Sequence, residues 1–550
     1  MLLAAPSGAY SYMHTDTNNK RLHLSAINPW VPGPYLPLAA NTSNQSGITP
    51  DELERAVVRA LRSWQRASFD AFSFDYWQGD DSRVYAVGMK RDGLSSLFFA
   101  SADPEHGGLT RSQSAYTRVY FDAETGAIDE VDIVLNDVDM KFTADPVQAS
   151  YAGGDEGHVI VLEDVLAHEF GHALGLGHSG ILDATMFAFG WEGQAALSCD
   201  DARAVRALYG TGDERSALTG RVLDPEGKAV FGAHVVAVEL SGPSVAASTI
   251  SSRDGGYRIA GLPRGSYVVM VEPFVAGAPA LDDAYADLSL TSSCYGRRFS
   301  RTFYGRENGR LDVFRLAASS TTSAGDVIVS CFGVAPTTAF DDFAPPVLEF
   351  DDSGDLATLL LAPPGAGGQM QVRTKEGPLQ LDFVAYSLFS PALVRPRLEG
   401  AEPEVATADL ANSMSLPEHT GRDARLRSDW VAAGEHTVTL ETSLLGPQTY
   451  PMGGTYLDEE PFVLVVGHQR APTSRTECTQ RAPLSDYSPP LDGPRRRILD
   501  DDGLFGLSCH AVPGSPPARG QGWPVLCAIG ALIALCYRAG FGRRRGRTPR

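Results

Sequence analysis

Three histidines and one glutamate in the segment 168–179 have the types and spacing of a metal-centred active site. His168 and His172 lie four residues apart, so on a helix they share one face, and both rings can reach one metal ion at about 2.0–2.1 Å. Glu169 follows His168 directly. Its carboxylate can approach a water at an open metal position without occupying a position itself, which is the placement that a general base needs.

A third candidate ligand follows a glycine. Gly175 can adopt a positive φ, so the chain can turn sharply and bring back His178. Three neutral imidazoles leave the fourth position of a tetrahedral zinc ion open for water, whose pKa zinc lowers to about 7. The pattern therefore indicates a catalytic zinc site rather than a closed structural one. A bare H-E-x-x-H also arises by chance on buried helices, but the fixed glycine and the third histidine make chance a rare explanation.

Two helices and several strands must position these residues. The zinc-binding segment should be a core-facing helix, because its apolar residues recur at spacings of three and four: Leu162, Val165, Leu166, Phe170 and Leu174. An earlier helix should start at Thr49, with a proline in the first turn and Glu52 at the capping-box position. We expect its buried face to comprise Leu53, Ala56, Val57, Ala60, Leu61 and Trp64. Strands are predicted at 23–27, 35–38, 83–87, 96–99, 117–121 and 130–136.

The complete run H-E-x-x-H-x-x-G-x-x-H resembles the metzincin zinc proteases, and two details resemble their matrixin branch. Ser179 directly follows the third histidine, where other branches carry an acidic residue. Met186, eight residues after His178, stands at the spacing of the methionine turn that underlies the zinc site. Residues 197–210 also resemble the closing helix of matrixin catalytic domains. The resemblance covers residues 10–213.

This resemblance implies a zinc endopeptidase that acts on proteins or peptides. Its catalytic domain would be α+β, with a mixed twisted sheet and a long active-site helix. One zinc ion would be held by His168, His172 and His178, with Glu169 as the general base. Gly175 and Met186 would give structural support. Whether the domain also binds a structural calcium ion or a second zinc ion stays open, because no motif in the sequence supports either ion.

Two segments are expected to contact the substrate by the same resemblance. Residues 130–136 resemble the edge strand on which matrixin substrates lie, so Ile133, Val134 and Leu135 are candidates, with an ordinary strand as the alternative. The loop after Met186 would wall the pocket for the side chain that follows the scissile bond. Its candidates are Phe187 and Phe189, although packing beneath the zinc site would use the same residues.

The chain after residue 217 predicts all-β sandwich domains, so the fold class is multidomain. Residues 217–335 show short alternating strands separated by glycine turns and resemble the carboxypeptidase regulatory-like, transthyretin-like β-sandwich. Such modules are usually spacers or binding surfaces, and we expect His234 there to be structural rather than a metal ligand. Residues 343–468 predict another β domain of no recognised family, with strands near 357–361, 379–386, 436–441 and 461–466.

Both ends of the chain carry features of export. Residues 1–9 resemble the remnant of a signal peptide without its basic region, which a gene start placed too far downstream or another export route would explain. Residues 471–521 are rich in Pro, Ser, Arg and Gly, which predicts a linker. In the tail, 522–550, an apolar stretch that would span about 22 Å as a helix precedes six arginines.

This tail resembles the C-terminal sorting tails of bacterial surface proteins, notably myxobacterial ones. Arginines on the far side would keep the C-terminus in the cytoplasm and place the protease outside. We therefore expect an extracellular or envelope-attached enzyme. Cleavage of the tail and its retention as a membrane anchor both stay open.

The amino-acid composition limits which classes of partner and metal site are expected. Lys and Arg number 46 against 67 Asp and Glu, a net charge of −21, so a nucleic acid would be repelled and is not expected. We expect a monomer. None of the seven cysteines forms a C-x-x-C pair, which argues against a thiolate zinc site. Cys294 with Cys331 and Cys478 with Cys509 are candidate disulfides, with reduced thiols as the alternative.

A second hypothesis for the whole chain comes from another functional class. A surface binding or adhesion protein could carry a vestigial protease domain. The presence of Glu169 beside all three histidines favours the enzyme, because an inactive relative has no chemical need for that carboxylate.

Overall fold

The computed structural model describes most of the chain as far as residue 329 and, beyond it, individual strands. The described residues are 12–13, 20–25, 33–78, 89–103, 109, 111, 113–150, 158–179, 181, 184–187, 190, 193–210, 216–240, 245–273, 299, 302–305, 311–329 and the strands between residues 347 and 514. The chain separates into two compact units, residues 1–513 and 514–550. Among the described residues, no helix has both the length and the apolar character needed to cross a membrane.

Several expectations fall outside the described residues. These are the signal-peptide remnant at 1–9, the strand at 83–87, the tail at 522–550 and the cysteines Cys294, Cys331 and Cys478. The segment expected to be a linker, 471–521, differs from that expectation in one respect, because it contains the strand β25 (Ser508–Gly514).

A mixed sheet forms the centre of the first domain. Its strands are β1 (His23–Leu24), β2 (Tyr35–Ala40), β3 (Ser73–Gln78), β4 (Ser96–Phe99), β5 (Gln113–Phe121) and β6 (Ala127–Leu135). The order is β25-β5-β6-β4-β2-β3, with β1 paired to β6. Strand β5 runs antiparallel to β6, whereas β4, β2 and β3 continue the sheet in parallel.

The strand that was expected at the edge of the sheet lies in its interior, so that expectation is wrong. In β6, Ile133 stands opposite Thr117 of β5 on one side and opposite Leu97 of β4 on the other. The main chain of β6 is therefore used on both sides, and Ile133, Val134 and Leu135 are fully buried. A substrate strand cannot add there, because its hydrogen-bonding groups are already paired.

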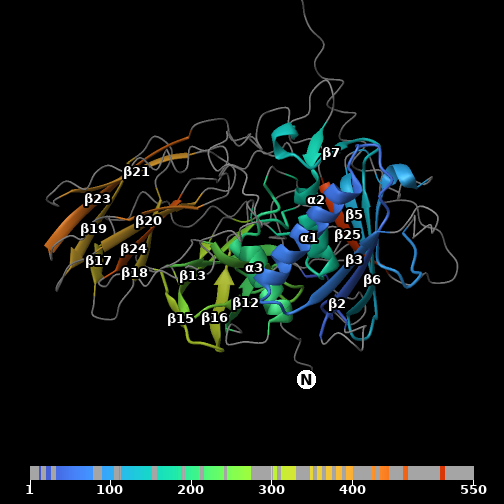
Figure 1. Cartoon of the computed structure of the whole chain (residues 1–550). Coiled ribbons are helices and arrows are strands. Elements are labelled where there is room, and N and C mark those ends of the chain that lie inside the picture. The colour runs from blue at the N-terminus through green and yellow to red at the C-terminus, as the bar shows by residue number, and fades with distance from the viewer. Residues whose placement is uncertain are drawn as a thin grey trace, which may run out of the picture. The chain divides into compact units, whose positions relative to one another are not determined.

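Two helices cover one side of this sheet (Figure 1). Helix α1 (Pro50–Ala67) starts as predicted, with Thr49 as N-cap and the complete capping box with Glu52. All six residues of its predicted apolar face are buried, and the Trp64 indole donates to the carbonyl of Ala167 in helix α2 (Leu162–Ala173) at 2.8 Å. Helix α1 thus fixes the helix that carries the histidines.

Short elements complete the first domain. Strands β7 (Lys141–Thr143) and β8 (Val159–Val161) pair in parallel, and β8 leads directly into α2. Among the described residues, 3-10 turns occur at Ala100–Ala102 and Pro146–Gln148. Helix α3 (Cys199–Tyr209) is capped by Ser198 and closes the domain, as the sequence predicted.

The second domain consists of two packed sheets. The first has the order β12-β9-β16, from β9 (Ser216–Leu223), β12 (Gly256–Leu262) and β16 (Thr321–Ile328). The second has the order β11-β10-β13-β14, with β15 paired to β13, from β10 (Ala233–Glu239), β11 (Val245–Ile250), β13 (Gly265–Pro273), β14 (Thr302–Phe303) and β15 (Phe314–Leu316). Their buried apolar side chains join those of the first domain in one core cluster.

Two further four-stranded sheets follow. One has the order β17-β19-β23-β21: β17 (Val347–Phe350), β19 (Gly367–Thr374), β23 (Gly434–Leu444) and β21 (Ala392–Glu399). The other has the order β18-β24-β20-β22: β18 (Leu356–Leu361), β24 (Phe462–His468), β20 (Gln380–Tyr386) and β22 (Asp423–Arg427). The four strands expected in 343–468 are present as β18, β20, β23 and β24, so this segment is β-rich as predicted.

Candidate metal centre

The three histidines of the motif come together in the structure. His168 and His172 lie on one face of α2, and the turn after the helix brings His178 beside them. Ring centroids are 4.7 Å apart for His168 and His172, 5.2 Å for His168 and His178, and 4.8 Å for His172 and His178. One potential ligand atom of each ring lies within 4.8 Å of the others, the one such group of three found among the described residues.

Main-chain carbonyls orient two of these rings. Nδ1 of His168 lies 2.6 Å from the Thr185 carbonyl, and Nδ1 of His172 lies 2.8 Å from the Leu176 carbonyl. Because a carbonyl only accepts, each Nδ1 carries the proton and the lone pair is on Nε2. This arrangement is the one that metal-binding histidines use, and three neutral imidazoles suit zinc. The residues present therefore fit the ion that the sequence implies.

The turn after α2 depends on its glycine. The helix ends at Ala173, and Gly175 has a φ of +93°, which confirms the predicted positive φ. A Cβ added at Gly175 would lie 2.3 Å from the carbonyl oxygen of Leu22. Glycine is therefore required at this position for two reasons: the positive φ and the close approach of the segment before β1.

Met186 packs against helix α2 at Gly171, the residue before His172. Its side chain is buried, and a Cβ added at Gly171 of α2 would meet its Sδ at 2.1 Å. The methionine turn is held by Asp201, which accepts from the main-chain N–H of Thr185 at 2.7 Å and of Met186 at 3.1 Å. Burial, with the nearby charge of Asp200 as a second cause, raises the pKa of Asp201 to about 7.

Glu169 is buried beside the histidines and contacts strand β5. The Thr117 hydroxyl donates to Oε2 of Glu169 and lies 3.4 Å from the carbonyl oxygen of the same residue. No feature of the sequence indicated Thr117, because a threonine on an alternating strand is ordinary and nothing local shows which helix it faces.

The residues expected to contact the substrate lie in different parts of the structure. Phe187 is buried, its N–H donates to the Ala184 carbonyl at 3.1 Å, and its carbonyl accepts from Gln194 Nε2 at 2.9 Å. Phe189 lies outside the described residues. Ile133, Val134 and Leu135 belong to the interior of the sheet, away from any edge.

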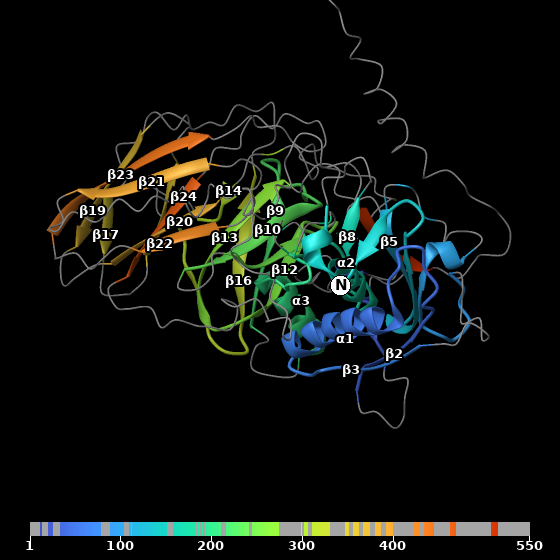
Figure 2. The same cartoon turned by 45° about the horizontal axis from the view of Figure 1, so that its top comes forward.

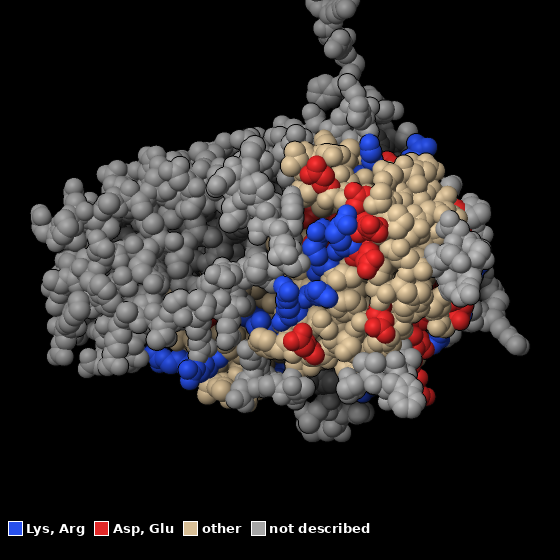
Figure 3. All heavy atoms as spheres, in the orientation of Figure 1, with Lys and Arg blue, Asp and Glu red and all other residues tan. Residues whose placement is uncertain are grey.

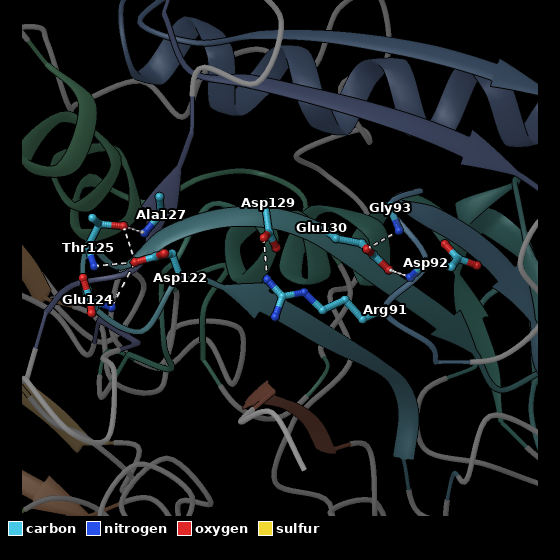
Figure 4. A network of polar contacts seen from close by, with 9 residues as sticks. All are labelled: Arg91, Asp92, Gly93, Asp122, Glu124, Thr125, Ala127, Asp129 and Glu130. Carbon is cyan, nitrogen blue, oxygen red and sulfur yellow. Dashed lines mark hydrogen bonds and ion pairs between the residues drawn. The ribbon is translucent and has the colours of Figure 1, made fainter. Parts of the chain in front are cut away.

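A group of acidic side chains on β6 and the neighbouring loops serves to anchor those loops (Figure 4). Glu130 accepts from the main-chain N–H groups of Asp92 at 2.8 Å and Gly93 at 2.6 Å. Asp129 pairs with Arg91 at 2.5 Å. Because these carboxylates already bind loop N–H groups and an arginine, we interpret them as structural residues. On the face drawn in Figure 3, acidic and basic side chains lie beside one another, in keeping with a mixed surface.

Comparisons with known proteins give a family to two segments. Residues 38–210 match the family model described as matrixin, and residues 217–274 match that of the carboxypeptidase regulatory-like domain. Metalloendoproteinase 4-MMP of Arabidopsis thaliana is 29% identical over 179 residues, which are 30% of this chain and 42% of the relative. Interstitial collagenase B of Mus musculus is 43% identical over 63 residues, which are 11% of this chain and 14% of the relative.

The chain thus spans less than half the length of these curated relatives. Among solved structures, a Streptococcal ancillary pilin is similar over 46% of this chain and 59% of that chain, with 9% identity and a TM-score of 0.14, which carries no argument about the fold. A matrixin domain followed by a carboxypeptidase regulatory-like domain is the arrangement that the sequence predicted. Homology to the matrixin family suggests a zinc metalloendopeptidase, and that family implies a catalytic zinc ion, which the histidine triad could bind.

Proposed function

We propose that this chain is a zinc-dependent endopeptidase that hydrolyses peptide bonds within proteins. One observation carries the proposal: three histidines converge beside a buried glutamate, inside a segment that matches the matrixin family. His168, His172 and His178 would hold the ion. When bound, zinc would supply Lewis-acid polarisation of the scissile carbonyl and of the attacking water.

The remaining chemistry comes from the chain. Glu169 takes the proton of the attacking water and later passes it to the leaving amine, as a general base that becomes a general acid. The Thr117 hydroxyl holds one oxygen of this carboxylate, so the other oxygen keeps a defined direction. Phe187 stays our candidate for the wall of the side-chain pocket.

We also propose that the enzyme works as a monomer outside the cell or on the bacterial envelope. The support is the sequence alone: the apolar and arginine-rich tail at 522–550 and the apolar first residues. Fractionation of cells, with mass analysis of the mature C-terminus, tests this part. Soluble cytoplasmic protein with an intact Arg550 would refute it.

The alternative is a surface binding or adhesion protein with a vestigial protease domain. It is less well supported, because Glu169 and its contact with Thr117 are both present. A digest of a peptide library with the purified chain separates the two functions.

The decisive experiment compares two variants. Glu169→Gln should abolish hydrolysis and leave one zinc ion per chain, because the change removes the base and no ligand. His172→Ala should lose zinc and hydrolysis together. Glu163→Gln, on the same helix but paired with Arg59, serves as the matched control and should remain active. Undiminished turnover by Glu169→Gln would refute the mechanism.

A further inference from the structure

Helix α3 of the first domain packs against the β-sandwich. Its neighbours there are β11 and β12, and Figure 2 shows α3 beside β12. Gly261 of β12 has a φ of +70°, and a Cβ added to it would lie 2.8 Å from the Arg203 carbonyl oxygen of α3. The two backbones therefore approach as closely as glycine allows, which is the packing of a permanent interface rather than of a flexible spacer.

Charged groups are buried between the two domains. Arg203 of α3 lies 3.4 Å from Glu239 of β10, and their side chains are 3% and 2% exposed. Removing one partner from a buried ion pair costs about 3–5 kcal/mol, because the other charge is left uncompensated. Each of these two charges therefore has its partner in the other domain.

One contact across this interface leads to the metal centre. Asp200, buried in the first turn of α3, accepts from the main-chain N–H of Ser248 in β11 at 2.7 Å. Its other oxygen accepts from the Ser179 hydroxyl at 2.6 Å. One carboxylate therefore joins the sandwich to the residue that follows His178.

Ser179 in turn fixes the segment that presents His178. Its N–H donates to the Met186 carbonyl at 2.7 Å, and its hydroxyl accepts from the N–H of Ile181 at 3.0 Å. Because the hydroxyl donates to Asp200 and accepts from Ile181, its orientation is set on both sides. A displaced Asp200 would release one of these two restraints.

We propose that the β-sandwich is a working part of the metal centre: the Ser248 N–H fixes Asp200, and Asp200 fixes Ser179 and thereby His178. This inference rests on the proposed role of His178 as a zinc ligand. Asp200 and Ser248 are positioning residues, since neither touches the reacting atoms. The sequence suggested a spacer or binding surface for this domain, and the contacts give it a second role.

The geometry of β11 permits a test of this single hydrogen bond. Strand β11 is at the end of its sheet, and the N–H of Ser248 points to α3 rather than to β10. Proline lacks this N–H and is tolerated on an edge strand where the group faces outward. Ser248→Pro in the full chain should therefore remove the contact and keep the sheet. The Ser248 hydroxyl also hydrogen-bonds Asp200. Ser248→Ala removes this hydroxyl and keeps the N–H, so it separates the two contributions.

The readouts are the zinc dissociation constant, from competition with a chromophoric chelator, and the visible spectrum of the Co²⁺-loaded chain. Loss of a residue that supports a ligand typically weakens metal affinity by about 10–100-fold. We expect about a 10-fold weaker zinc affinity and a changed Co²⁺ spectrum for Ser248→Pro, and a smaller effect for Ser248→Ala, which keeps the N–H contact with Asp200. In an Asp200→Asn background, Ser248→Pro should have an effect of under about 3-fold, because the two changes act on one path.

Wild-type zinc affinity and Co²⁺ spectrum in folded Ser248→Pro would overturn the proposal. If that variant does not fold, Asp200→Asn and Ser179→Ala decide the matter, and unchanged values in both would overturn it equally. These readouts do not depend on hydrolysis. A wild-type chain that binds zinc but cleaves no peptide would refute the proposed function and leave this inference intact.

Discussion

Main-chain carbonyls orient His168 and His172. The Gln194 amide also lies 3.4 Å from Nδ1 of His168 and donates to the Thr185 carbonyl at 2.8 Å. The carbonyls belong to Thr185 and Leu176, which lie in two turns that the chain makes after α2. A side-chain substitution cannot remove a carbonyl, so these ligands are sensitive to the shape of the turns instead. This explains in physical terms why the motif fixes a glycine between the histidines.

At the residue scale, Thr117 should matter for turnover and not for metal binding. Thr117→Val keeps the shape and removes the hydroxyl that holds Glu169. A hydrogen bond to a charged group contributes about 1.5–3 kcal/mol, so kcat should fall at least about 10-fold, with zinc content unchanged. Thr117→Ser keeps the hydroxyl and should restore most of the rate. A wild-type kcat in Thr117→Val would contradict the positioning role.

The buried carboxyl group of Asp132 predicts how the stability of the fold depends on pH. It is buried and accepts from the Ser96 hydroxyl at 2.6 Å and the Lys90 N–H at 3.0 Å. Burial raises its pKa to about 7, against about 3.9 for an unfolded chain. The protonated form is thus favoured by folding, and this stabilisation is complete below about pH 4 and is lost as the pH rises through 7.

Asp132→Asn removes this titration. The free energy of unfolding of the variant minus that of the wild type should therefore be larger at pH 8 than at pH 5 by more than about 1 kcal/mol. Urea unfolding at both pH values measures it. The histidines are the same in both chains, so their protonation cancels in the difference. An equal difference at the two pH values would show that Asp132 titrates normally.

At the scale of elements, local patterns predicted the helices better than the sheet. The capping box at Thr49 and the apolar spacing after it depend on residues within a few positions, and α1 has both the predicted start and the predicted buried face. The strands β5 and β6 were both expected, but their order in the sheet was not. Both alternate in the same way, and only long-range pairing decides which one is interior.

The turn after α2 can be tested against another glycine with the same backbone. Gly175 and Gly47 both have positive φ, but a Cβ at Gly47 meets nothing within 4 Å. Gly47→Ala should cost only the left-handed strain of about 1–2 kcal/mol. Gly175→Ala should cost more and should weaken zinc binding, because the Leu22 carbonyl lies in the way. Urea unfolding and zinc affinity measure both, and equal effects of the two substitutions would contradict the role of this close approach.

At the scale of the molecule, the first domain and the sandwich share one apolar core. The sequence could delimit both segments, because each carries its own motif and texture. It could not show that Asp200 meets Ser248 or that Arg203 meets Glu239, since these contacts join residues 36 to 48 positions apart across two domains. The sequence showed only that α3 contains charged residues, and charged residues on a helix more often face solvent.

This shared core predicts how the chain tolerates truncation. A chain that ends at residue 335 lacks β25 at the end of the first sheet but keeps the interface, so it should unfold cooperatively and bind zinc. A chain that ends at residue 213 exposes the face of α3 that contacts β11 and β12, and it leaves Arg203 without Glu239. Apolar surface that the sandwich covers would then face water, at a cost of about 25 cal/mol per Å², against a typical stability of only about 5–15 kcal/mol. We therefore expect the shorter chain to aggregate or to melt at a much lower temperature, with weaker zinc binding.

Thermal melting followed by circular dichroism, together with chelator competition, compares the two chains. If the shorter chain matched the longer one in both melting temperature and zinc affinity, the sandwich would be an appendage and α3 would be stable without it.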